Sequence, residues 1–260
     1  SNDLYSPLTV SFSTDNRFAY VAEAKERNLN VIHLSTQQLV AAFPLQDTGN
    51  QPVRDLKGTA DGREMYSAAS YCKDYNCFIR HYTFPDNLYE DMSLSRERNI
   101  PDMEITKGES KLVAGNICYG SCGGYIDVMD RRTKEVTAIP TSMAAQHLTY
   151  DEAAQTLWSI CLKPGIDDSA YYCEPYTQNQ DRIDVVDMNT MERMASIPVA
   201  VTFGFPSLSQ NGEFFYAVNN MQDVIVAINT KNYNISAISV GDNPRGIYLQ
   251  GDNRVKEAIL

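Results

Sequence analysis

The chain has 260 residues, a formal net charge of −11 at pH 7 and a sequence pI of about 4.7. Charge of this sign repels phosphate backbones and anionic lipid, which argues against nucleic acid and simple membrane surfaces as partners. No stretch approaches the roughly 18 consecutive apolar residues of a membrane-spanning helix, so the sequence predicts no transmembrane segment.

Five segments share one pattern of strands and turns. Each has a turn rich in Asp, Asn, Gly or Ser, typical of a β-hairpin and clearest at Asp-Gly and Asn-Gly. A hydrophobic strand follows each turn, and these strands begin at Arg17, Arg63, Lys111, Gln155 and Glu213. One strand precedes each turn and two more come later. The repeating unit therefore has four strands, named a, b, c and d in chain order, with strand b after the turn.

The b strands begin 46, 48, 44 and 58 residues apart. Four-stranded units at a period of about 40 to 50 residues indicate a β-propeller. Tandem β-sandwiches, the alternative, would give about seven strands per hundred residues without this register. We predict an all-β fold, a single β-propeller domain over 1–260 with five full blades and a partial sixth. The expected blades are about 5–49, 50–99, 100–145, 146–202, 203–242 and, in part, 243–260.

The last third of the chain carries the most specific motifs. They are Ile197-Pro198-Val199, Asn211-Gly212, Tyr216 to Asn219, Val224 to Thr230 and Gly241 to Gly246. Over residues 194–249 these motifs resemble the YVTN-type β-propeller repeat. The resemblance implies the fold and an extracytoplasmic location, and it implies no chemistry because propellers host many functions. The sixth blade holds only strand a and part of strand b, so we expect either a longer ring or a second chain that completes it.

The six cysteines form three local pairs, each between strands b and c of the second, third or fourth blade. Cysteines at the base of a hairpin loop can meet the Cα separation of a disulfide, about 4.4 to 6.8 Å. We therefore predict the bonds Cys72–Cys77, Cys118–Cys122 and Cys161–Cys173. Such bonds would place the protein in the periplasm, at the cell surface or outside the cell.

Two other interpretations of the cysteines stay open. The pairs have four, three and eleven intervening residues and no histidine in these loops, which is unlike the paired spacing of zinc ribbons. Free buried thiols are the second alternative. Asp167, Asp168 and Glu174 lack the ligand spacing of a known calcium loop. We expect no metal and no cofactor.

Seven of the sixteen tyrosines lie in or beside these b–c loops. Tyrosine gives rigid, amphipathic contact area at low entropy cost, and rigid loops lower the ordering cost of binding. Single tyrosines can instead cap the blade core. As a cluster, they predict a binding surface formed by Tyr71, Tyr75, Tyr119, Tyr125, Tyr171, Tyr172 and Tyr176.

The d–a loops share a face with the b–c loops and add polar residues that we expect to rim the central channel. These candidate binding residues are Arg54, Asp55, Asp102, Glu104, Gln146, His147 and Arg245. Of the three histidines, His33 and His81 alternate with apolar neighbours in c strands and are expected to be structural. His147 is better placed for chemistry, but no nucleophile motif accompanies it.

Three functions follow from this pattern. The first is a non-catalytic binding or scaffold propeller that holds a protein, peptide or glycan through its stapled, tyrosine-rich face. The second is an enzyme or enzyme subunit, because YVTN-like propellers resemble lactonases and the propeller subunits of periplasmic amine dehydrogenases. A lactonase would need a metal or a His/Asp/Glu cluster in the channel. The third is a structural surface-layer or adhesion module. The sequence favours the first and names no catalytic residue.

Overall fold

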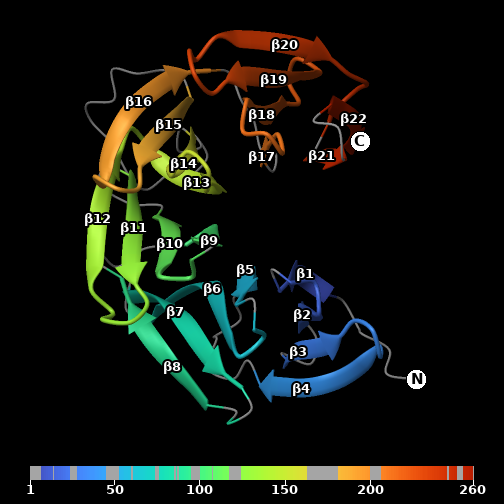
Figure 1. The fold of residues 1–260 in the computed structure, drawn as a ribbon, viewed down its shortest axis with the longest axis vertical. Coiled ribbons are helices and arrows are strands. Elements are labelled where there is room, and N and C mark those ends of the chain that lie inside the picture. The colour runs from blue at the N-terminus through green and yellow to red at the C-terminus, as the bar shows by residue number, and fades with distance from the viewer. Residues whose placement is uncertain are drawn as a thin grey trace. The chain divides into compact units, whose positions relative to one another are not determined.

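The structure is a computed structural model in which the chain folds into consecutive antiparallel sheets (Figure 1). Its contacts divide the chain into two compact units, described here one at a time: residues 1–117 with 127–138, and residues 118–126 with 139–260. The structure describes residues 7–13, 15–23, 28–44, 53–59, 61–73, 76–84, 86, 88–94, 100–106, 108–116, 124–162, 181–199, 206–244, 246–250 and 254–259.

The first unit contains two complete four-stranded sheets with strands in sequential order. The first sheet consists of β1 (Pro7–Phe12), β2 (Phe18–Glu23), β3 (Asn28–His33) and β4 (Gln38–Pro44). The second consists of β5 (Val53–Gly58), β6 (Glu64–Lys73), β7 (Asn76–Thr83) and β8 (Leu88–Ser93).

A third sheet joins β9 (Met103–Ile105), β10 (Lys111–Asn116), β11 (Gly124–Asp130) and β12 (Val136–Thr141) in the same meander order. Its strands β11 and β12 contribute residues to both units.

Two more four-stranded sheets and one two-stranded sheet belong to the second unit. The fourth sheet has β13 (Ala144–Asp151), β14 (Thr156–Leu162), β15 (Arg182–Asp187) and β16 (Glu192–Pro198). The fifth has β17 (Ser207–Leu208), β18 (Phe214–Asn219), β19 (Val224–Asn229) and β20 (Ile235–Ser239). The last sheet pairs β21 (Gly246–Gln250) with β22 (Arg254–Ile259).

Five four-stranded meanders are the blades of a β-propeller, so the predicted fold class is confirmed. The two-stranded sheet stands where the partial sixth blade was expected. β13 begins at Ala144, two residues before the expected start of the fourth blade at about 146, and its register with β14 shifts between Ala145 and His147. Among the described residues, no helix is long and apolar enough to span a membrane.

The turn between strands a and b uses a repeated side-chain device. Ser13 Oγ accepts from the backbone N–H of Phe18 (3.0 Å) and donates to Asp15 Oδ1 (2.7 Å), which fixes the chain reversal. Thr59 with Asp61 and Ser209 with Asn211 repeat this hydroxyl–oxygen pair. The next residue in each turn, Asn16, Gly62 or Gly212, has a positive φ of 57°, 70° or 68°. Asn and Gly tolerate that conformation, which explains why Asp-Gly and Asn-Gly marked these turns.

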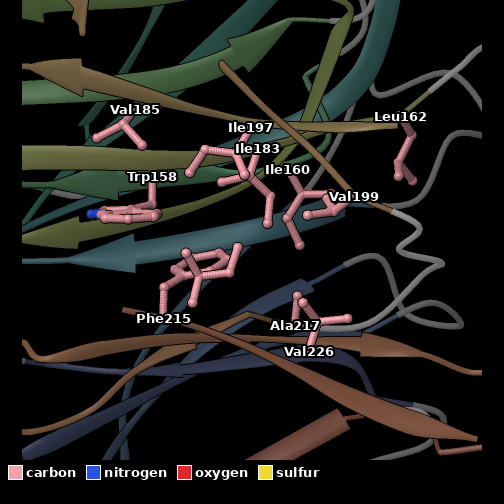
Figure 2. Close-up of a cluster of buried hydrophobic side chains, with 11 residues drawn as sticks. Trp158, Ile160, Leu162, Ile183, Val185, Ile197, Val199, Phe215, Ala217 and Val226 are labelled. Carbon is pink, nitrogen blue, oxygen red and sulfur yellow. The ribbon is translucent and has the colours of Figure 1, made fainter. Parts of the chain in front are cut away.

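Neighbouring sheets within each unit pack face to face through apolar side chains. In the second unit, Trp158 of β14 stacks on Phe215 of β18 with ring centroids 5.0 Å apart, as Figure 2 shows. Both are at most 1% exposed, and Ile183, Ile197 and other aliphatic residues surround them. In the first unit, Tyr20, Leu29 and further residues join the first sheet to the second, and Ile79, Leu112 and further residues join the second to the third. Burial of each large apolar side chain stabilises the fold by about 1.5 to 3 kcal/mol.

Candidate functional site

The hairpin between β6 and β7 places two predicted cysteines opposite each other. β6 has 10 residues and β7 has 8, whereas β2 and β3 have 6 each. After an irregularity beyond Ala68, the register pairs Cys72 with Cys77. Directly opposite residues of antiparallel strands have Cα atoms about 4.5 to 5.5 Å apart, within the range of a disulfide. Their side chains lie outside the described residues, so the bond itself stays a prediction.

Most other residues of the predicted tyrosine-rich face lie outside the part of the chain that the structure describes. This holds for Tyr75, Tyr119, Tyr171, Tyr172, Tyr176, Cys118, Cys122 and Cys173, and for the side chain of Tyr71. Tyr125 is described, and its side chain is half-buried in β11.

Cys161 differs from the prediction. It carries a free, fully buried thiol within β14, opposite Arg182 of β15, so the structure does not form the expected bond to Cys173. The physical reason is that β14 continues past Cys161, and the thiol contacts Ser159 Oγ at 3.6 Å instead of facing a loop. Burial, and secondarily the charge of Asp184, raise the pKa of the Cys161 thiol to about 12. Because the thiolate is the reactive form, this thiol is inert in the folded protein.

Asp184 is a buried carboxylate that sequence analysis missed. Its side chain is fully buried, and it accepts hydrogen bonds from the backbone N–H of Ser142 (2.6 Å) and from Ser142 Oγ (3.0 Å). Ser196 Oγ donates to it at 2.5 Å, and Arg193 Nη1 lies 3.5 Å away. A buried charge is tolerated when its lone pairs are satisfied in this way, so Asp184 fixes β15 to its neighbours.

Three predicted channel residues come together at the first strands of the second and third sheets: Asp55 in β5, Glu104 in β9, and Asp102 directly before β9. The backbone N–H of Met103 is 2.9 Å from both Asp55 Oδ2 and Asp102 Oδ1. Lys57 Nζ lies 3.5 Å from Glu104 Oε1 and 3.6 Å from Asp55 Oδ2. The structure thus brings Asp55, Asp102 and Glu104 together, and their role in binding stays a prediction. It adds Lys57, which alternation along β5 places on the same side as Asp55.

Opposing charges dominate this inner-strand cluster of Asp55, Lys57, Asp102 and Glu104. Burial disfavours the charged amine of Lys57, but the carboxylates of Glu104, Asp55 and Asp102 outweigh it and raise its pKa. Burial also raises the pKa of Glu104, with Lys57 acting in the opposite direction. In the described part of the chain, no group of three or more His, Cys, Asp or Glu residues is arranged to hold a metal ion. The ion pair between Lys57 and Glu104 therefore connects β5 to β9.

The remaining predicted channel residues are Arg54, Gln146, His147 and Arg245. Arg245 and the side chain of Arg54 lie outside the described residues. His147 and Gln146 lie in β13 of the second unit and are partly buried there.

His81 lies between two carboxylates in the first unit. Its Nε2 is 3.0 Å from Glu64 Oε2 and its Nδ1 is 3.0 Å from Glu90 Oε1. The Tyr66 ring stacks on the imidazole at 4.6 Å, and Arg131 Nη2 reaches Glu64 at 2.7 Å. Both ring nitrogens of His81 therefore lie within hydrogen-bond distance of a carboxylate oxygen.

The two carboxylates beside His81 are held in their ionised form. Burial opposes ionisation of Glu64, but hydrogen bonds from Tyr66 and Arg131 outweigh it and lower its pKa. Hydrogen bonds from His81 and Lys134 lower the pKa of Glu90. The network connects β6, β7, β8 and the turn after β11, which is compatible with the expected structural role of His81.

Comparison with known proteins supports the fold and no more specific relationship. No family model matches the chain, and no curated protein matches its sequence. Hydrazine synthase of Kuenenia stuttgartiensis is similar in structure, with TM-score 0.72, 13% identity, and coverage of 95% of this chain and 71% of that one. The β-propeller domain of Cps50 (Swd1) of Myceliophteria thermophila gives TM-score 0.69 at 12% identity, covering 93% of this chain and 76% of that one.

A third similar structure is the dihydro-heme d1 dehydrogenase NirN in complex with DHE, with TM-score 0.65 and 12% identity. The match covers 92% of this chain and 49% of that one, so the chain spans about half the length of NirN. At these identities the likeness shows the propeller fold alone.

Replacing Lys57 by Met tests the inner-strand cluster. Leaving half-buried carboxylates without their cation should cost about 1 to 3 kcal/mol of unfolding free energy at pH 7. A carboxyl group whose folded pKa is raised stabilises the fold below its unfolded pKa and loses that contribution as the pH rises. Glu104 behaves in this way, and Lys57→Met should raise its pKa further. Urea unfolding should therefore show a smaller difference between Lys57→Met and the parent at pH 4 than at pH 7. An equal or larger difference at pH 4 would contradict this account.

Thiol labelling and peptide mapping test the assignments of Cys161 and of the Cys72–Cys77 pair. Under native conditions maleimide should leave Cys161 unmodified, and in denaturant it should label that thiol. Peptide mass mapping without reductant should recover Cys72 joined to Cys77. Cys72 linked to any other cysteine, or Cys161 linked to Cys173, would refute these assignments.

Proposed function

We propose that the protein is an extracytoplasmic binding or scaffold propeller that holds a protein, peptide or glycan partner. The contact surface is the set of b–c loops with their tyrosines. One observation carries the proposal: the β6–β7 hairpin is longer than the β2–β3 hairpin, and its backbone register pairs Cys72 with Cys77. A disulfide there holds Tyr71 and Tyr75 on a stiff hairpin, which lowers the ordering cost of binding.

The contacts of the described charged residues support a binding function rather than a catalytic one. Lys57 pairs with both Asp55 and Glu104. Both ring nitrogens of His81 contact carboxylates. These residues connect strands to one another, and we therefore assign recognition to the loops. Disulfides in those loops would form in an oxidising compartment, which agrees with an extracytoplasmic location.

A triple substitution tests this proposal. The oxidised protein is immobilised beside a Tyr75→Ser, Tyr119→Ser, Tyr172→Ser variant, and partners are captured from the native extract. Truncated tyrosines at the centre of an interface often cost 2 kcal/mol or more each, so the partner's affinity should fall by at least about tenfold. Calorimetric titration with the purified partner gives the affinity for each protein.

Tyr89→Ser is the matched control, because Tyr89 is 51% exposed on β8, away from the b–c loops. The control should bind like the parent, and all three proteins should have comparable melting temperatures. Equal affinity of the triple variant and the parent would overturn the assignment of recognition to these tyrosines.

A second candidate is a propeller that forms part of an enzyme. Two of the similar structures are a hydrazine synthase and a dihydro-heme d1 dehydrogenase, which is the observation that favours it. Turnover of a lactone panel, or co-purification with a redox subunit, would support this candidate. Co-purification with a non-enzymatic partner would support the first.

A further inference from the structure

A groove of about 680 Å³ lies in the first unit, at the end of the second sheet opposite its Cys72–Cys77 hairpin. This volume is within the range of ligand sites, about 300 to 1,000 Å³. The a–b and c–d turns of the second sheet form one side of it, and strands of the first sheet form the other. The lining residues are Phe18, Val31, Val40, Ala41, Asp61, Gly62, Arg63, Phe84 and Asp86.

The apolar walls of the groove are fixed by packing. Phe84 meets Phe43 edge to face with ring centroids 4.7 Å apart, and Val31 is only 2% exposed. A Cβ added to Gly62 would lie 2.5 Å from Phe18 Cε2, and the φ of Gly62 is +70°. Glycine therefore lets the turn lie directly against the Phe18 ring. These walls are preformed, so a ligand need not order them.

A bulge in β4 leaves Val40 exposed at the groove. The register between β3 and β4 pairs Val31 with Ala41 and then Ile32 with Leu39, so it skips Val40. The Val40 side chain is 53% exposed. β4 is also the last strand of its sheet, and the outer edge of such a strand offers backbone groups for a further strand.

The charged residues of the groove favour a cation. Asp61 Oδ1 accepts from Thr59 Oγ1 (2.7 Å) and from the backbone N–H of Arg63 (3.0 Å). Asp61 Oδ2 has only a loose contact with Arg63 Nε, at 3.9 Å, and Asp86 is exposed as well. The groove lining holds two carboxylates and one guanidinium on a chain of net charge −11, so the local field attracts positive charge.

We propose that this groove binds an extended peptide segment of a partner protein in which an aromatic or aliphatic side chain stands next to a basic one. The apolar side chain lies between Phe18, Phe84 and Val40, and the basic one pairs with Asp61 or Asp86. The peptide backbone adds to the edge of β4, which distinguishes a peptide from a small amphiphilic amine. This site does not rest on the b–c loops and goes beyond the function proposed above.

The test uses a fluorescein-labelled heptapeptide of Thr and Val residues with a central Phe-Arg pair. Counterparts carry Phe-Glu or Gly-Arg at the centre. Anisotropy titration should give saturable binding of the Phe-Arg peptide and affinities weaker by about tenfold or more for both counterparts, as expected from one lost apolar or ionic anchor. Amide NMR shifts on binding should fall in residues 38–44.

Val40→Arg and Met194→Arg form a matched pair of variants. Met194 occupies the corresponding bulge of β16, where Val185 pairs with Ala195 and Val186 with Arg193, and it is 56% exposed. Both positions are exposed enough to accept arginine without unfolding. Val40→Arg should weaken the Phe-Arg peptide about tenfold through lost contact and charge repulsion, and Met194→Arg should leave it unchanged.

Four results would overturn the proposal: no saturable binding of the Phe-Arg peptide, equal binding of the Phe-Glu peptide, equal loss in both variants, or shifts confined to residues outside the groove and β4. If n-octylguanidinium binds as tightly as the peptide, a small amphiphilic cation rather than a peptide is the ligand, which also overturns it.

Discussion

The fold depends on face-to-face packing of amphipathic four-stranded sheets. A single meander of this length cannot bury its apolar face alone, and each one gains stability only against the next. Trp158 against Phe215 in the second unit and Leu56 with Tyr82 in the first unit show the same solution with different side chains. Tight turns set the spacing of the strands, so the loops between strands b and c are free to vary in length and carry cysteines or tyrosines.

A second constraint recurs inside the sheets. The second residue of the buried run in strand c is polar in the first four sheets: Asn30, Arg80, Asp127 and Asp184. Each is at most 5% exposed, and each has a partner. Asn30 donates to Glu23, Arg80 pairs with Asp91, Asn116 donates to Asp127, and Ser142 donates to Asp184. In the fifth sheet Val226 takes this position. These buried polar residues therefore connect neighbouring segments within the sheets.

Local sequence patterns were sufficient to predict the sheets and only part of the candidate site. Asp-Gly and Asn-Gly turns and the alternation of apolar residues act over a few residues, so strands a to d followed from the sequence. Asp55, Asp102 and Glu104 were predicted only as polar residues at the rim of a channel. Lys57 beside Glu104, Arg131 beside Glu64, and the groove at Val40 depend on contacts between sheets, which no local pattern specifies. Cys161 was assigned to the connection between strands b and c because the other two cysteine pairs lie there, whereas β14 extends past it and buries it.

We propose that the propeller recognises its partner at hairpin ends and grooves, while the cluster of Asp55, Lys57 and Glu104 connects strands to one another. Hydrogen–deuterium exchange of the oxidised protein, with and without its captured partner, tests this most directly. The account predicts slowed exchange in residues 70–78 or in β4, with β5 and β9 unchanged. Slowed exchange confined to β5 and β9 would place the partner on the cluster of Asp55, Lys57 and Glu104, and it would contradict the account.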